Sequence, residues 1–376
     1  MVAMIFVNDL ASVKGLPWWT YHMPRHVSGM TYVDVVFPAF LFVLGMAIPL
    51  AIRRRVSQGD SPLRQWTHIA ARSFSLVVLG LILANAEKAD PRLIGLPDGV
   101  WPLLALAGAI LFWMRYPRGG SRRYYRVLKY AGLIALIVAL ALFRRTDRSG
   151  HAAWLDFGYW EILGLIGRAY LAACILYYPF RNRVWAPPAI FLGLTALNIA
   201  SRIWMPPLQT RLPYALWPFD SGELPSIVFA GIVTWSIFFE ERLRLGFRAR
   251  AWLALGFAAT LFAAGRALSF LGISKIGATP SWCLYCSGIG VVLFLAIYWL
   301  VDVHGWRKWA AFARPAGANT LLTYLLPDLF YFAFGTAWAT LAPESGWPGV
   351  ARSAIFTAAM LGVSAVLTRM KVRLQL

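Results

Sequence analysis

Residues 18–55 read WWTYHMPRHVSGMTYVDVVFPAFLFVLGMAIPLAIRRR, and this stretch decides the fold. A polar loop with two histidines leads into about 18 mostly apolar residues, which is long enough to cross a bilayer core of about 30 Å. Three arginines, Arg53, Arg54 and Arg55, close the run, as expected at the cytoplasmic end of a span. Asp34 lies just inside the run, where a charge is costly and usually functional. The stretch therefore predicts a membrane-spanning helix with ionisable groups at its outer end.

The composition extends this prediction to the whole chain. Of 376 residues, 59% are hydrophobic and 14% are charged, with a mean hydropathy of +0.61. Soluble proteins are rarely so apolar, and the 18 Trp and 15 Tyr suit the two interfaces of a bilayer. The net charge of +20 would also suit nucleic acid, but the basic residues lie between apolar segments. There they orient the protein and meet anionic lipid headgroups, so we expect membrane lipids and no nucleic acid as partners.

We predict an all-α, polytopic membrane helical bundle of about 11–12 transmembrane helices, with residues 1–376 forming a single domain. Loops rich in Lys and Arg alternate along the chain with less basic loops, and the basic loops are expected on the cytoplasmic side. This places loops 14–31, 144–158 and 202–224 outside. Residues 1–13 resemble the second half of a span, so we expect a first span truncated at its cytoplasmic end. The apolar segments lie at 1–13, 32–52, 68–86, 100–114, 130–143, 159–179, 186–204, 225–239, 251–270, 280–301, 317–337 and 350–368.

His22 and His26 share the first outer loop and are the best candidates for chemistry near neutral pH. Histidines four apart can also bind a metal on a helix, but Pro24 lies between them and no HExxH pattern occurs. Cys283 and Cys286 form a CxxC without a second pair of ligands, which favours two core residues. We therefore expect a general base or nucleophile and no metal, with an interfacial histidine as the plainer alternative.

Other polar residues are expected inside the membrane. Asp34 suits a helix N-cap, a role compatible with orienting an imidazole. Glu161 and Arg168 lie seven apart on one helix face, so they are expected to face the bundle interior and to pair with each other or with other partners. Three amides that are expected to be buried suggest a polar cavity: Asn8, Asn198 and Asn319.

Several motifs match one known family. Trp18-Trp19-Thr20-Tyr21-His22 reads as a Trp-Trp-x-x-His element, and Gly29-Met30-Thr31-Tyr32-Val33-Asp34 as a Gly-x-Thr-x-x-Asp element, with Asn8 before them. With these, the chain resembles the heparan-alpha-glucosaminide N-acetyltransferase family, whose bacterial members belong to the transmembrane acyltransferase superfamily. Weaker similarities are EILGLIGRAYL around Arg168, FDSGELPS around Asp220, TPSWCLY from Thr279, DVHGWRKW from Asp302 and GANTLLTYLL around Asn319.

The resemblance implies an integral-membrane enzyme that moves an acetyl or similar acyl group from cytosolic acetyl-CoA to an acceptor across the membrane. The acceptor would be an amino sugar or glycan. His22 takes the place of the catalytic histidine, and Asn8 that of its partner at the acyl group. The intervals around His22 are longer than the family's, so His26 stays open as the base. The large lumenal domain of the family's animal members is absent, so the resemblance implies a protein of the bacterial inner membrane, possible as a homodimer.

Chemistry assigns the remaining residues. Asp34 would hold the imidazole tautomer, and Arg53, Arg54 and Arg55 would bind the CoA phosphates. We expect substrate contacts from four further residues: Arg168, Asn319, Asp220 and Trp19. The sequence leaves open whether His22 acts as a general base or forms an acyl-imidazole.

An alternative without covalent chemistry is a multi-span transporter or a lipid-linked carrier. Asp34, Glu161 and Arg168 would then serve a substrate or proton path through the membrane.

Overall fold

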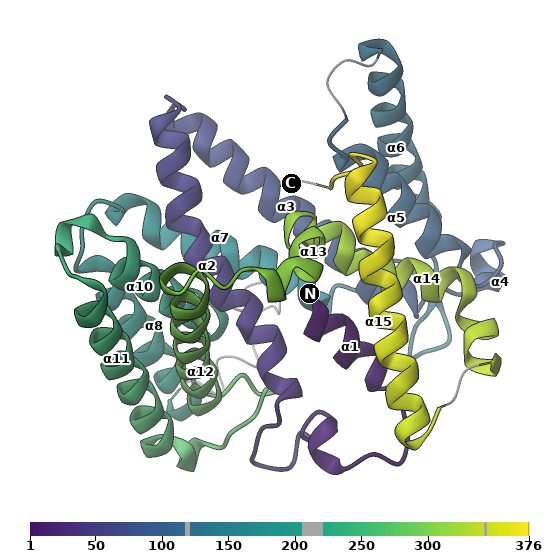
Figure 1. The fold of residues 1–376 in the computed structure, drawn as a ribbon. Helices are drawn as coiled ribbons and strands as arrows, with labels where there is room; N and C mark the ends of the chain where they lie inside the picture. Colours follow the sequence, from purple (N-terminus) through teal and green to yellow (C-terminus); the bar gives the residue numbers. More distant parts are fainter. Residues whose placement is uncertain (117–120, 205–220, 342–343, 375) are drawn as a thin grey trace. The chain divides into compact units, whose positions relative to one another are not determined.

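The computed structural model describes residues 1–116, 121–204, 221–341, 344–374 and 376. Across these residues nearly all regular structure is helical (Figure 1). The two strands, β1 (Arg145–Thr146) and β2 (Ala152–Ala153), form one short antiparallel hairpin. The prediction of an all-α polytopic bundle is confirmed.

Each predicted apolar segment contains a helix. By length and hydropathy, seven helical segments of the described chain can cross a bilayer: α2 (Val33–Ser57), α3 (Pro62–Ala86), α6 (Arg122–Leu142), α7 (Glu161–Phe180), α8 (Ala186–Ile203), Pro280–Val303 and α15 (Gly346–Arg369). Two apolar helices are shorter, α5 (Val100–Trp113) and α10 (Glu223–Phe239). These helices make the chain a multi-pass membrane protein. The count of 11–12 spans stays a prediction, and the nine residues of α1 (Val2–Leu10) rise only about 14 Å.

The chain forms two compact units, each built from separate parts of the sequence. Unit 1 contains Met1–Trp18, Val78–Glu161 and Lys308–Leu376. Unit 2 contains Trp19–Val77 and Ile162–Arg307. Each unit is described below by itself, and the single-domain prediction stays a prediction.

In unit 2, α10 is the central helix, and it packs most extensively against α2. Glycines on both helices make this contact possible. A Cβ atom added to Gly45 would lie 1.9 Å from the carbonyl oxygen of Val228, and one added to Gly231 would lie 2.0 Å from that of Phe42. Small residues at helix crossings let backbones approach closely in membrane proteins, so this pair fixes where α2 lies.

The other elements of unit 2 surround this pair. Helices α11 (Phe247–Ala267) and α12 (Pro280–Tyr298) pack against each other, and α8 and α12 pack against α10. The short elements of this unit are η1 (Trp18–Thr20), η3 (Glu241–Leu243), η4 (Ser269–Leu271) and η5 (Trp299–Val303). The first residue of η1, Trp18, belongs to unit 1.

In unit 1, α5 packs against α6, and α1 packs against α15, as Figure 1 shows in purple and yellow. Ile5, Leu326, Phe356 and Met360 form a buried apolar cluster between α1, α14 (Thr320–Leu341) and α15. The remaining elements are α4 (Pro91–Ile94), η6 (Lys308–Ala313) and α13 (Arg314–Ala318).

Candidate active site

The loop before α2 is tied to the loop before α12 within unit 2. The Gly29 N–H donates to the Ile273 carbonyl at 2.9 Å, and the Ile273 N–H donates to the Ser28 hydroxyl at 3.0 Å. Within the first loop, the Thr31 hydroxyl donates to the Tyr21 carbonyl at 2.8 Å. These bonds hold residues 21–31 and 273–275 together although they are far apart in the sequence.

Asp34 is the second residue of α2 and lies in its first turn, rather than at the predicted N-cap position, which Tyr32 occupies. A carboxylate here is favoured by the positive end of the helix dipole, and Arg54 and Arg55 suit the opposite end. Its Oδ2 accepts the backbone N–H groups of Thr31 at 3.0 Å and Met23 at 3.3 Å. The side chain is only 1% exposed, so these donors replace water around the carboxylate.

The second oxygen of this carboxylate meets His22. Nδ1 of His22 lies 2.7 Å from Oδ1 of Asp34, and the imidazole is 42% exposed. An ionised carboxylate only accepts hydrogen bonds, so the proton of a neutral ring lies on Nδ1 and the lone pair on Nε2. His22, rather than the exposed His26, is therefore the histidine that the buried carboxylate orients.

A third residue, Lys275, joins this pair, although it is not among the site residues predicted from the sequence. Its Nζ lies 3.3 Å from Nδ1 and 3.2 Å from Nε2 of His22. Partial burial lowers the pKa of Lys275 below the ordinary lysine value, while the Asp34 carboxylate opposes this shift. Lys275 precedes the TPSWCLY segment by four residues, but only the contact between the two loops brings it to His22.

The other predicted residues are dispersed. Asn8 is exposed on α1 in unit 1, so its predicted burial is wrong; the neighbouring Asp9 is the buried residue. Trp19 is half exposed, with its ring centre 6.1 Å from that of Tyr32. Arg168 is buried in α7. Asp220 lies outside the described residues.

The two remaining asparagines are buried as predicted, each 1% exposed. The Asn319 amide donates to the Val372 carbonyl at 2.8 Å and accepts the Leu374 N–H at 3.1 Å. It thus holds the C-terminal segment in unit 1, and substrate binding by Asn319 stays a prediction. Glu161 accepts the Tyr324 hydroxyl at 2.8 Å in the same unit.

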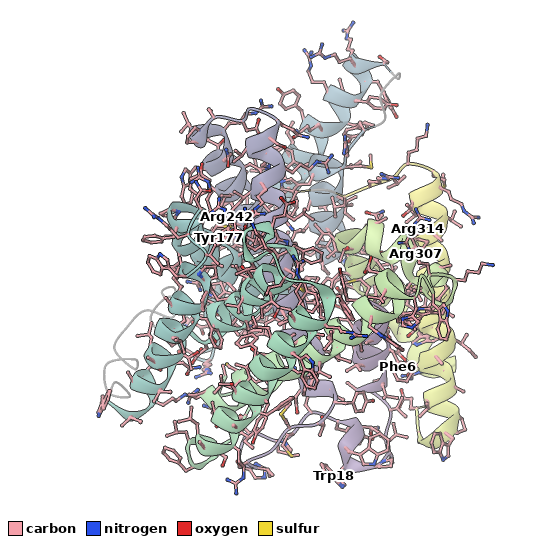
Figure 2. All side chains as sticks on the ribbon, turned by 60° about the vertical axis from the view of Figure 1, so that its left-hand side comes forward. Phe6, Trp18, Tyr177, Arg242, Arg307 and Arg314 are labelled. Atoms are coloured by element: carbon pink, nitrogen blue, oxygen red, sulfur yellow. The ribbon has the colours of Figure 1, made fainter. Side chains whose placement is uncertain are left out.

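The arginine end of α2 borders a hollow of about 210 Å³. Arg53 and Arg181 line it with Tyr177, which Figure 2 labels. Arg53 also binds the Glu240 carboxylate and lies 4.3 Å from the centre of the Trp235 ring. The two guanidinium groups make this hollow suitable for an anion, although the Glu240 carboxylate already binds that of Arg53.

The other two predicted arginines differ from Arg53. Arg55 donates to Asp60 at 3.0 Å, and Arg54 is exposed. All three stay predicted contacts of a CoA phosphate.

Comparison with known families gives a match over residues 1–204 to a model described as "Domain of unknown function (DUF5009)". This match covers more than half of the 376 residues. The chain belongs to the DUF5009 family. That family carries no described activity, so membership does not by itself assign a reaction to the DUF5009 chain.

Two curated relatives add a similarity. The DUF5009 chain is 36% identical over 87 residues to human heparan-alpha-glucosaminide N-acetyltransferase, and 35% identical over 85 residues to the mouse protein of the same name. Each match covers 23% of this chain and 12% of the relative. The chain thus matches only a small part of these relatives, but their name agrees with the resemblance found from the motifs.

Proposed function

We propose that this DUF5009 chain is an integral-membrane acyltransferase. It moves an acetyl or similar acyl group from cytosolic acyl-CoA to an amino sugar or glycan on the other side of the membrane. The observation that carries the proposal is the contact of His22 with Asp34, because it gives an accessible imidazole a fixed orientation. The N-acetyltransferase relatives support the reaction class.

Acyl transfer needs a group that removes the acceptor's proton. Nε2 of His22 takes the proton of the acceptor amine or hydroxyl while the nitrogen or oxygen of the acceptor attacks the thioester carbonyl. The C–S bond breaks, a C–N or C–O bond forms, and the proton passes to the sulfur of CoA. In the other route Nε2 attacks the thioester carbonyl first, the C–S bond breaks and CoA leaves as the thiolate. The acceptor then attacks the acyl-imidazole, the C–N bond to the ring breaks, and the acceptor's proton passes to the thiolate. Asp34 orients the ring in both routes.

The donor would be held at the arginine end of α2. Arg53 and Arg181 would contact its phosphates in the hollow described above. Asp34 and Arg53 are 53 − 34 = 19 residues apart on one helix, which is roughly 28 Å along its axis. A donor anchored at the arginine end must therefore extend its thioester arm along α2 to reach His22.

The test is transfer of labelled acetyl from acetyl-CoA to glucosamine by the purified chain in nanodiscs. We expect His22→Ala to reduce the rate by about 10²-fold or more, the usual contribution of a general base. His26→Ala is the matched control, since His26 is exposed in the same loop and should leave the rate unchanged.

Unchanged transfer by His22→Ala, or loss in His26→Ala alone, would reject the assignment. Solute flux into proteoliposomes without acyl-CoA, together with no acetyl transfer, would favour the transporter instead.

A further inference from the structure

Lys275 lies beside the His22 ring but has no role in the acyl transfer proposed above. Its ammonium group is within 3.3 Å of both ring nitrogens of His22, and the ring is 2.7 Å from the Asp34 carboxylate. The three ionisable groups therefore share one small, partly buried space. Their charges must be considered together.

The buried carboxylate needs a positive partner. Asp34 is 1% exposed, and the two backbone N–H groups of Thr31 and Met23 that donate to it stabilise but do not neutralise its charge. If His22 were its only cationic neighbour, the carboxylate would favour the imidazolium form of the ring. An imidazolium has no lone pair, so it can neither accept a proton nor attack a thioester. A base in this position needs another group to supply the positive charge.

Among the residues that the structure describes, the other elements around the site place few charges near the ring. From α12, the buried thiol of Cys286 interacts electrostatically with Asp34 and Lys275. From α8, Arg202 lies beside Gly277, and its guanidinium is 3.7 Å from the Glu223 carboxylate of α10. Arg25 and His26 of the first loop are exposed to solvent. Among these groups, Lys275 is the cation that contacts the His22 ring.

We propose that Lys275 is the counter-ion of the buried Asp34 carboxylate and thereby keeps the His22 imidazole uncharged, with a nitrogen lone pair for acyl transfer. The pair of opposite charges sums to zero, and a cation this close to the ring opposes a second proton on it. Lys275 is thus a positioning residue that acts through His22. This role rests on the proposed function, since an uncharged imidazole is what that reaction requires.

The test compares Lys275→Met and Lys275→Arg with the wild-type chain. In Lys275→Met the carboxylate has only the ring as a cationic partner, so protonation of His22 becomes more favourable. We expect the acid limb of the pH–rate profile of acetyl transfer to move upward by about one to three pH units. Activity should be lost near neutral pH and should recover at alkaline pH. Lys275→Arg keeps the charge and should keep the wild-type limb.

Lys88→Met is the matched control, because Lys88 also pairs with a carboxylate, Asp156 at 2.7 Å, in unit 1. It should leave the profile unchanged. A purely structural role for Lys275 would lower the amount of folded protein without moving the limb. The proposal is overturned if Lys275→Met keeps the wild-type limb, or if Lys275→Arg shifts it as far as Lys275→Met.

A second readout separates this inference from the proposed function. Histidine-selective ¹⁵N labelling follows the protonation of His22 directly, with His22→Ala identifying its signals. The titration midpoint of His22 should be higher in Lys275→Met than in the wild type, whether or not the chain transfers acetyl. If the wild-type chain transfers no acetyl but the His22 midpoint still rises in Lys275→Met, the proposed function is rejected and the role of Lys275 is retained. Equal midpoints in both chains reject the role of Lys275.

Discussion

Asp9 of unit 1 and Asp34 of unit 2 are both buried beside a basic side chain, and the two arrangements differ in their access to solvent. In unit 1, the Asp9 carboxylate lies 3.3 Å from Nη2 of Arg352, with side chains 1% and 5% exposed. Tyr331 donates to the same carboxylate, and Arg352 also donates to Ser12 at 2.6 Å. In unit 2, the equally buried Asp34 has a partner, His22, that is 42% exposed.

The difference separates a structural ion pair from the pair that we propose to be reactive. The Asp9 carboxylate contacts Tyr331 of α14 and Arg352 of α15, so the cluster can join these helices to α1 but offers little surface to a substrate. At Asp34 the buried oxygen atoms fix an imidazole whose other side faces outward. A buried carboxylate alone therefore does not indicate an active site, whereas a buried carboxylate with an accessible titratable partner is a candidate for one.

The largest effect is expected from Asp34→Asn. An amide can donate to Nδ1 and so stabilise the wrong tautomer, with the lone pair turned away from the acceptor. We expect kcat for acetyl transfer to fall by about 10²–10⁴-fold, with the helical circular dichroism signal retained. A variant that keeps wild-type kcat would show that Asp34 is no more than a structural carboxylate, as at Asp9.

Asp9→Asn should act on stability instead. It leaves the Arg352 charge buried without its carboxylate, which typically costs about 3–5 kcal/mol. We expect a lower midpoint of unfolding in detergent, with kcat per folded molecule close to the wild type. Removing both charges, in Asp9→Leu with Arg352→Met, should recover most of the stability, because a well-packed apolar pair replaces the ion pair. If Asp9→Asn lowers kcat as strongly as Asp34→Asn, the distinction between the two clusters fails.

This contrast also shows what the sequence could and could not predict. Apolar runs long enough to cross a bilayer predicted the helices, because bilayer thickness sets their length. His22 and Asp34 are 12 residues apart, and their motifs pointed to both residues before their contact was known. Lys275 is 253 residues from His22 and meets it only through two paired loops, which no local pattern encodes. Its role could not be predicted for that reason.

The wrong expectation at Asn8 has a similar physical cause. Successive residues of a helix point about 100° apart, so a short apolar helix buries one neighbour and exposes the next. The composition of residues 1–13 shows that the segment is apolar but not which side packs inward. Arg352 of α15 decides this, because its charge requires Asp9, rather than Asn8, to face it.

The smallest effect tests the side chains that support each carboxylate. Thr31→Val removes a hydroxyl 3.3 Å from Asp34 and its bond to the Tyr21 carbonyl, and should lower kcat by about tenfold or less. Ser12→Ala removes an acceptor of Arg352 and should lower the free energy of unfolding by about 1 kcal/mol, with kcat unchanged. Steady-state kinetics and detergent unfolding on both variants check these values. The comparison holds only if Thr31→Val lowers kcat and Ser12→Ala lowers stability alone. The reverse pattern would make Asp9 the reactive carboxylate and Asp34 the structural one.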